Sequence, residues 1–400
     1  MNYYRKMAKY FPRKMRGLIL HIWSRKPKLK RDAKRYKICI FKVENGIGDF
    51  VLALGTIQFL VKKYGESECL LIIPQEVAGL AKYHFPKVDV IDIPGCLISV
   101  WQNVIPSIPL LKPIFSTFQC EELFCFRHRR EFYHELVLGW IHAQKAYAHP
   151  SILYRTADSM YHMVRLNWKS YKYDSAISFH PELVSSRAIA KWKGEVPAEL
   201  FRHKCVLELG GHDGITIEQL LPKINYISER VIDELLICPF GSTPIRDIPV
   251  ETLLKVLMEL RERQYFGQYV LVGAAQRGDD LLAYKSKLEN HRIKDVMTDS
   301  AKDLLGLYDM IASAKVILTT ETSIAHIATA MNRPAVILLG GAQYGQFGPW
   351  KQSENQIWLT HKLPCFGCDW SCVLNRPECV QDISPDDILA AISKVLIANG

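Results

Sequence analysis

The residues best suited to chemistry in this chain lie between positions 315 and 350. A β-branched apolar run, residues 316–320, stops at Glu321, and a helix-like pattern then continues to Met331. A second apolar run, residues 335–339, ends in two glycines. This order predicts strand, turn, helix, strand and glycine turn, which is one βαβ unit. Because ligands bind beyond the carboxyl ends of strands in open parallel sheets, we expect a binding site in these loops.

Polar side chains and glycines gather in the two loops of this unit. They are Glu321, Thr322, Ser323 and His326 around the helix start, and Gly340 and Gly341 after the second strand. Free backbone N–H groups and the helix dipole attract anions at a helix start, phosphate among them. The sequence therefore predicts an anion-binding site. For His326, the alternative is a hydrogen-bonded histidine that packs the helix on its sheet.

A carboxylate follows the first predicted strand, residues 37–43. Asp49 comes directly after Gly46-Ile47-Gly48, and glycines allow a substrate to approach the backbone closely. A carboxylate at the end of a strand is suited to removing a proton from a bound hydroxyl group. Its alternative role is to cap the next helix, which is worth about 1 kcal/mol. Glu44 is the spare candidate for the base.

Two groups of cationic side chains are candidates for binding phosphate. Arg246 lies with Ser242 and Thr243 in the turn GSTPIRDIP, which follows the predicted strand LLICPF. A fixed cation there would bind a phosphate group. The run Arg127-His128-Arg129-Arg130 would likewise bind phosphates, and its alternative is a solvated charged face.

These loops need a scaffold, and strands alternate with helices in both halves of the chain. The first half has predicted strands at 37–43, 68–74, 88–94 and 122–126, and the second at 235–240, 268–274, 316–320 and 335–339. The pattern predicts two doubly wound, Rossmann-like parallel sheets that face each other across a cleft. We expect a leader at 1–36, an N-terminal Rossmann-like domain at 37–222, a C-terminal Rossmann-like domain at 223–384 and a final helix at 385–400.

Charge is distributed unevenly along the 400 residues. Residues 1–37 contain 14 Lys or Arg and one Asp, whereas the remainder sums to −3, against +10 for the whole chain. The leader also carries aromatic and aliphatic side chains, but its apolar stretch 17–23 is too short to span a bilayer. It lacks a signal-peptide cleavage site, which argues against export. Attachment to an anionic membrane surface is one interpretation; a solvated tail and nucleic-acid binding are the others.

Eleven cysteines without an export signal indicate reduced thiols in a cytoplasm. Seven lie in apolar runs and are expected to be small buried side chains: Cys39, Cys69, Cys96, Cys120, Cys125, Cys205 and Cys238. The other four lie close together, at Cys365, Cys368, Cys372 and Cys379. They are compatible with structural zinc, although the C-x6-C half has unusual spacing, and with packed or redox-active thiols.

Four motifs in order resemble those of the heptosyltransferases, glycosyltransferase family nine, over nearly all of residues 37–390. The first is NGIGDFVLALGTIQFL after the opening strand, and the second is PFGSTPIRDIP. The third is VLVGA with its polar loop, and the fourth is TETSIAHIATAMNRPAVILLGG. The cysteine-bearing segment before the last helix is similar to family members as well.

The resemblance implies a GT-B fold and inversion at the sugar without a metal or cofactor. It implies a nucleotide-sugar donor, typically ADP-heptose, and a lipopolysaccharide acceptor at the inner face of a bacterial inner membrane. Asp49 falls at the general base, with Gly46 and Gly48 on the acceptor side. Arg246 falls at the phosphate-binding lysine, and arginine binds phosphate with a different geometry.

Two positions depart from the family pattern. Glu321 replaces the usual aspartate and Ser323 the usual glycine, so the loop would be crowded against the diphosphate or the sugar. No D-x-D pair or G-x-x-x-x-G-K-[ST] loop is present, which agrees with metal independence. Two alternative functions remain. One is a sugar-nucleotide epimerase of similar architecture, and the other is a degenerate sugar-nucleotide-binding protein.

Overall fold

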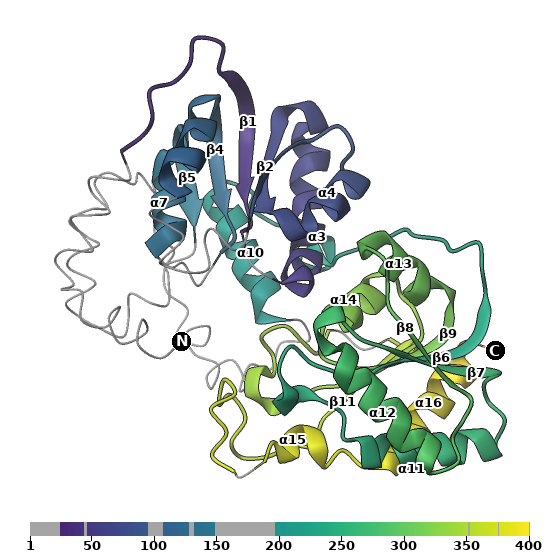
Figure 1. Ribbon diagram of the computed structural model, residues 1–400. Helices are drawn as coiled ribbons and strands as arrows, with labels where there is room; N and C mark the ends of the chain where they lie inside the picture. Colours follow the sequence, from purple (N-terminus) through teal and green to yellow (C-terminus); the bar gives the residue numbers. More distant parts are fainter. Residues whose placement is uncertain are drawn as a thin grey trace. The chain divides into compact units, whose positions relative to one another are not determined.

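The computed structural model describes residues 25–43, 46–94, 107–127, 132–148, 197–350, 353–374 and 376–399. The chain divides into two compact units, each built on one parallel sheet (Figure 1). The first unit takes its described residues from 25–43, 56–148 and 202–219, and the second from 46–55, 197–201 and 220–399. Most of the leader, Glu44, Cys96, Arg129 and Arg130 lie outside the described residues.

The sheet of the first unit has the order β3-β2-β1-β4-β5. Its strands are β1 (Lys34–Phe41), β2 (Cys69–Pro74), β3 (Asp89–Ile93), β4 (Phe118–Cys125) and β5 (Ala143–Ala148). All neighbours are parallel, and Phe41 at the end of β1 is in register with Cys125 at the end of β4. The helices are α3 (Ile47–Tyr64), α4 (Ala78–His84), α7 (Phe132–Trp140) and α10 (Ala198–Leu209).

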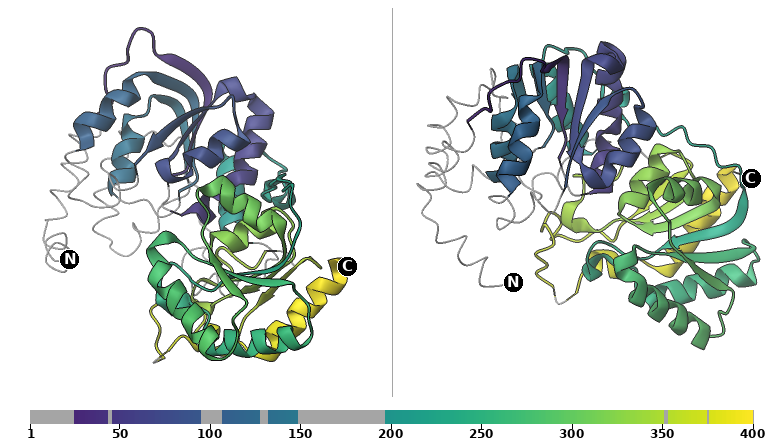
Figure 2. Two further views of the ribbon diagram at one scale, coloured as in Figure 1. Left: turned by 45° about the vertical axis from the view of Figure 1, so that its right-hand side comes forward. Right: turned by 45° about the horizontal axis from the view of Figure 1, so that its top comes forward.

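Both faces of this sheet are covered, because side chains along β1 alternate between them. Cys39 and Phe41 join a buried cluster to which α7 contributes Leu136 and Trp140. Ile38 and Ile40 point to the opposite face and are fully buried. Helices α3 and α4 lie on the side of the sheet away from α7 (Figures 1 and 2). The expected burial of the scattered cysteines is confirmed for the six that are described.

The sheet of the second unit has the order β11-β10-β9-β6-β7-β8. Its strands are β6 (Ile232–Cys238), β7 (Gln268–Val272), β8 (Val296–Asp299), β9 (Ala314–Thr320), β10 (Ala335–Leu338) and β11 (Gln356–Leu359). The order reverses between β6 and β9, as it does between β1 and β4 in the first unit. Both expected doubly wound parallel sheets are therefore present.

Helices cover both faces of the second sheet. One face carries α11 (Val250–Glu262), α12 (Gly278–Asn290) and α16 (Pro385–Asn399), and the other carries α13 (Leu304–Ser313) and α14 (Ser323–Ala330). In α11, Leu253, Val256, Leu257 and Leu260 are fully buried, which is the spacing of one helix face. The last helix, α16, packs on α11 and β10, so it is an integral part of this unit's core.

Short elements complete the chain. They are α15 (Glu378–Gln381) and 3-10 turns at Glu66–Glu68, Gln75–Val77, Lys112–Ser116, Ile217–Leu220, Pro244–Arg246, Ala275–Arg277 and Gly341–Gln343. The sequence pattern predicts that this helix starts near Phe50, whereas in the structure α3 begins at Ile47, three residues earlier. Asp49 therefore lies inside the first turn of this helix instead of before it.

Candidate functional site

The expected binding loops of the second unit meet where its strand order reverses. Strands β6 and β9 are parallel neighbours, and Cys238 is in register with Thr319. The Thr320 hydroxyl at the end of β9 donates a hydrogen bond to the backbone carbonyl of Arg246, 2.9 Å away, and so joins the two loops. This is the position at which open α/β sheets bind ligands.

Arg246 is held as a fixed cation in the loop after β6. It ends the 3-10 turn Pro244–Arg246, and its side chain is 17% exposed. The guanidinium donates to the Ser242 hydroxyl at 3.2 Å and to the backbone carbonyl of Glu321. A Cβ on Gly241 would overlap the side chain of Arg246, so the loop requires glycine there. The structure thus brings Arg246, Ser242 and Glu321 together as the sequence predicts.

A second arginine, Arg277, stabilises this loop, and the sequence pattern did not indicate it. Arg277 pairs with Asp247 and donates to the carbonyl of Gly241 at 3.1 Å. The Asp247 carboxylate also accepts from the N–H of Gly241 at 2.9 Å. The sequence signal for Arg277 is weak, because a single arginine after VLVGA is indistinguishable from a surface residue.

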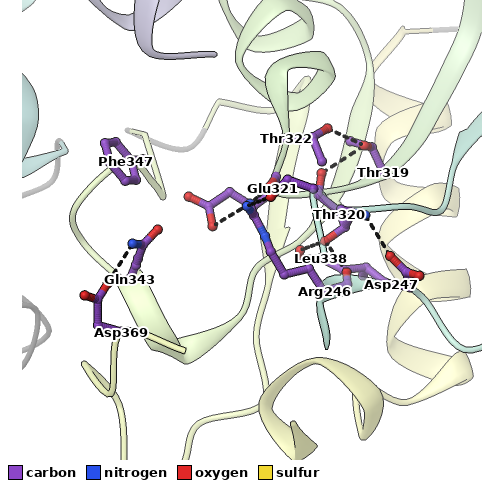
Figure 3. A network of polar contacts seen from close by, with 12 residues as sticks. Arg246, Asp247, Thr319, Thr320, Glu321, Thr322, Leu338, Gln343, Phe347 and Asp369 are labelled. Atoms are coloured by element: carbon purple, nitrogen blue, oxygen red, sulfur yellow. Dashed lines mark hydrogen bonds and ion pairs between the residues drawn. The ribbon is translucent and has the colours of Figure 1, made fainter. Parts of the chain in front are cut away.

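Glu321 places a buried carboxyl group beside Arg246. Its side chain is 3% exposed, and Oε2 lies 3.7 Å from the guanidinium. Neither carboxyl oxygen has a hydrogen-bond partner among the described residues. Burial raises the pKa of Glu321 to about 7, although Arg246 acts to lower it. The carboxyl group is therefore able to accept or donate a hydrogen bond near neutral pH. Figure 3 shows the contacts that join Arg246 to the loop of Glu321.

Helix α14 begins directly behind this pair. Thr322 is its N-cap residue but makes no side-chain capping hydrogen bond, and its hydroxyl lies 3.5 Å from that of Thr319. The N–H groups in the first turn of a helix have no intrahelical partner, so they are free to receive an anion. Thr322 and Ser323 thus lie at the start of this helix, as predicted, and binding of an anion there stays a prediction.

His326 is buried on α14 as a neutral side chain. It is 6% exposed, and burial, helped by Arg246, lowers its pKa to about 3. Its ring lies 5.8 Å from that of Trp350 and 6.4 Å from that of Trp358. These contacts agree with the packing part of the alternative, whereas the hydrogen bond is not seen, because Nδ1 of His326 has no partner among the described residues.

The first turn of α3 lies against α14. A Cβ on Gly48 would lie 2.9 Å from Cδ2 of His326 and 3.5 Å from Cα of Ser323. Residues 46–55 accordingly belong to the second unit. Asp49 is half-buried, and its carboxylate would overlap any Cβ on Gly46. Both glycines are therefore needed for close packing at this turn.

The expected acceptor residues follow the strands at which the order of the first sheet reverses. Phe126, just after β4, donates its N–H to the carbonyl of Phe41 at the end of β1, 3.2 Å away. Arg127 comes next and is half-buried. A ring nitrogen of His134 on α7 lies 3.2 Å from the carbonyl of Val43. Arg127 is thus at the same sheet edge as Val43, just after the end of β1.

Gly340 and Gly341 after β10 face aromatic rings of the cysteine-bearing segment. A Cβ on Gly340 would lie 2.7 Å from the indole of Trp370, and one on Gly341 would overlap Phe366. Both glycines are buried. Their role in the structure is close packing against this segment, which had no signal in the sequence.

The four clustered cysteines divide between surface and interior. Cys379 is buried, and Cys365, Cys368 and Cys372 are partly exposed. Within the described ranges, no group of three or more His, Cys, Asp or Glu side chains is arranged to hold a metal ion. No described helix is long and apolar enough to cross a membrane.

Comparison with solved structures shows the fold class. Glycosyl transferase family 9 from Veillonella parvula DSM 2008 aligns with a TM-score of 0.65 at 14% identity, covering 93% of this chain and 100% of that one. E. coli heptosyltransferase WaaC with ADP-2-deoxy-2-fluoro heptose aligns with a TM-score of 0.58 at 11% identity, covering 92% and 100%. The chain has the GT-B fold.

Sequence comparison confirms the heptosyltransferase resemblance. Residues 225–372, which form most of the second unit, match the model of glycosyltransferase family 9 (heptosyltransferase). Lipooligosaccharide heptosyltransferase 2 of Campylobacter jejuni is 24% identical over 110 residues. That match spans 27% of this chain and 34% of the relative's length.

Proposed function

We propose that this protein is an inverting, metal-independent glycosyltransferase that moves a heptose from ADP-heptose to a lipopolysaccharide or related cell-envelope glycan. The observation that carries the proposal is the Arg246–Glu321 pair at the switch point of the family 9 domain, beside the start of α14. A solved relative that holds an ADP-heptose analogue supports the donor, and a relative named for lipooligosaccharide supports the acceptor class.

In the proposed reaction, Asp49 acts as the general base. Its carboxylate takes the proton of an acceptor hydroxyl as that oxygen attacks the anomeric carbon of the donor. The bond from this carbon to the diphosphate oxygen breaks on the opposite face, so the configuration inverts. The half-buried position of Asp49 in the first turn of α3, directly after two closely packed glycines, supports this role.

The departing ADP gains negative charge, and we assign its stabilisation to Arg246 and the first turn of α14. The hydroxyls of Ser242 and Thr243 lie on the same loop as Arg246. Preorganised donors of this kind stabilise the transition state because they need no reorientation as charge develops. We assign the buried carboxyl group of Glu321, which has unused hydrogen-bonding capacity, to hydroxyl groups of the donor sugar.

On the acceptor side, we assign phosphate binding to Arg127, Arg129 and Arg130. The enzyme would work in the cytoplasm at the inner face of the inner membrane, attached through the basic leader. The mechanism uses no metal, so turnover should be unchanged after treatment with EDTA. A loss of activity that Mg²⁺ or Mn²⁺ restores would contradict that part of the proposal.

The decisive experiment compares the native protein with Asp49→Asn in an assay of ADP release and sugar transfer. Asp49→Asn should retain ADP binding and fold stability but lose at least 100-fold in turnover, which is within the usual contribution of a general base. Undiminished turnover would end the assignment. A new sugar nucleotide formed from donor alone would indicate the epimerase, and ADP binding without any turnover in the native protein would indicate a binding protein.

A further inference from the structure

The segment after β11 is fastened to the glycine turn that follows β10. The N–H of Gly367 donates to the carbonyl of Gly341 at 2.8 Å, and the N–H of Asp369 donates to that of Ala342 at 3.0 Å. The amide of Gln343 donates to the Asp369 carboxylate at 2.8 Å. Figure 3 shows this last contact near the Arg246–Glu321 pair. The segment that carries Cys365 to Cys379 is therefore a neighbour of the candidate donor site.

Trp370 connects this segment to Arg246. The guanidinium carbon of Arg246 lies 5.2 Å from the centre of the indole ring, which is within the range of a cation–π contact. The same indole fills the space beside Gly340, where any Cβ would lie 2.7 Å from it. The indole ring therefore lies between the backbone of Gly340 and the guanidinium of Arg246, the candidate phosphate-binding cation.

The backbone at this point is in an unfavourable conformation. Asp369 and Trp370 both have positive φ, 50° and 63°. The left-handed region suits glycine and, to a lesser degree, asparagine, and a bulky residue there is an outlier. Strained residues of this kind persist where the surrounding structure fixes them, and they concentrate at ligand sites. A strained tryptophan against Arg246 points to a role for its ring beyond packing.

We infer that Trp370 is a positioning residue for the donor site and that its indole fixes the guanidinium of Arg246 in the orientation that receives the donor diphosphate. The inference rests on the proposed function, because it takes Arg246 as the diphosphate-binding cation. Ser242 and the carbonyl of Glu321 accept hydrogen bonds from two guanidinium nitrogens, and the guanidinium carbon lies over the Trp370 indole. Without the ring, the side chain retains its charge but has more rotamers to lose when ADP binds.

The test uses Trp370→Asn in the full-length protein, with ADP as the probe in isothermal titration calorimetry. Asparagine tolerates positive φ, so the melting temperature should stay the same or rise. The dissociation constant for ADP should increase about fivefold, which corresponds to about 1 kcal/mol for a partly buried cation–π contact. A purely structural role predicts a fall in melting temperature together with the loss of affinity.

Two further variants sharpen the result. Trp370→Phe retains an aromatic face and should stay within about twofold of native affinity. Val373→Ala, at a 75% exposed position of the same segment, is the matched control and should change neither quantity. In an Arg246→Met background, Trp370→Asn should cause no further loss, because residues that act through one contact are not additive.

The outcomes separate the two ideas. If the native protein binds ADP and Trp370→Asn binds it equally well, or loses as much affinity in the Arg246→Met background as in the native one, the inference about Trp370 is overturned and the proposed function stands. If the native protein binds no ADP, the proposed function fails and the inference fails with it.

Discussion

The guanidinium of Arg246 contacts Glu321 in two ways. One of its nitrogens donates a hydrogen bond to the backbone carbonyl of Glu321, and the same nitrogen lies 3.7 Å from the Glu321 carboxyl group. The two residues come from the loops after β6 and β9, the strands between which the order of the second sheet reverses. The backbone contact keeps the cation in place whatever the charge of the carboxyl group. A bound diphosphate would therefore meet a fixed cation beside an acid that is able to release or take up a proton.

Replacing Arg246 should weaken ADP binding in a graded way. Arg246→Lys keeps the charge but loses the planar fork that contacts Ser242 and Glu321, so we expect a loss of several-fold. Arg246→Met also removes the charge and should cost roughly 10- to 100-fold, the range of one hydrogen bond to a charged group. Calorimetry with ADP measures both. Arg263→Lys, which affects an exposed pair with Glu259, is the control, and an equal loss there would contradict the assignment.

Glu321 should make fold stability fall as pH rises. Its pKa is raised from 4.5 to about 7 in the folded protein, so between these values the folded state binds more protons than the unfolded state. The free energy of unfolding then decreases with pH across this window. The stability difference between native protein and Glu321→Gln should change by roughly 3 kcal/mol from pH 4.5 to 7.

His326 acts in the opposite direction, which is why the native protein alone is a poor test. Its pKa is lowered from 6.5 to about 3, so the folded state binds fewer protons and stability rises with pH between these values. From pH 4.5 to 6.5 the two contributions oppose each other. In urea unfolding, the free energy of unfolding of Glu321→Gln should rise with pH in this window, because only the contribution of His326 remains. Glu354→Gln, at an exposed position, is the control, and a pH-independent difference for Glu321→Gln would refute the prediction.

Gly48→Ala should destabilise the turn before Asp49. The new Cβ would lie 2.9 Å from Cδ2 of His326, whose ring is confined by Trp350 and Trp358. Overpacking of this kind costs about 1–3 kcal/mol, more than alanine gains over glycine in a helix. Gly79→Ala on α4 is the matched control, because its Cβ would meet nothing within 4 Å. Chemical denaturation should show a loss for Gly48→Ala and a gain of about 0.5–1 kcal/mol for Gly79→Ala. Equal stability of the two variants would show that the first turn of α3 accommodates a Cβ at position 48, which would contradict the prediction.

The buried central strands and the loops after them could be predicted from sequence because their signals are local. β1, β6 and β9 are apolar runs that end in glycine, proline or acidic residues, and the site residues follow them directly. β5, β8 and β11 were not expected. AQKAYA at β5 is weakly apolar, and β8 and β11 have only four residues each, so none of the three has a clear period.

The contacts that support the site depend on tertiary packing and had no local signal. Trp370 lies 124 positions from Arg246 and reaches it only because the backbone after β11 bonds to the turn after β10. Likewise, the charge state of Glu321 follows from burial, which the sequence does not specify. Gly340 and Gly341, which were predicted to bind the donor, accommodate aromatic rings in the structure, and their contact with a donor stays a prediction.

Contacts of Pro27 and Lys30 determine how much of the leader should be deleted. The carbonyl of Pro27 lies 2.7 Å from a ring nitrogen of His142, and the N–H of Lys30 donates to the carbonyl of Ser116. A deletion that extends to residue 35 would cut into β1, so the deletion should cover residues 1–24 only. That segment contains six Lys or Arg and no Asp or Glu.

Deletion of residues 1–24 should leave the melting temperature unchanged and abolish binding to vesicles of anionic lipid. Each cation near an anionic surface contributes about 1 kcal/mol, and this attraction weakens as salt shortens the Debye length. Replacing the six basic residues by glutamine while keeping Trp23 separates charge from aromatic insertion. Binding that persists in this variant at high salt would place the attachment in the apolar side chains. Unchanged binding after the deletion would exclude the segment as a membrane anchor.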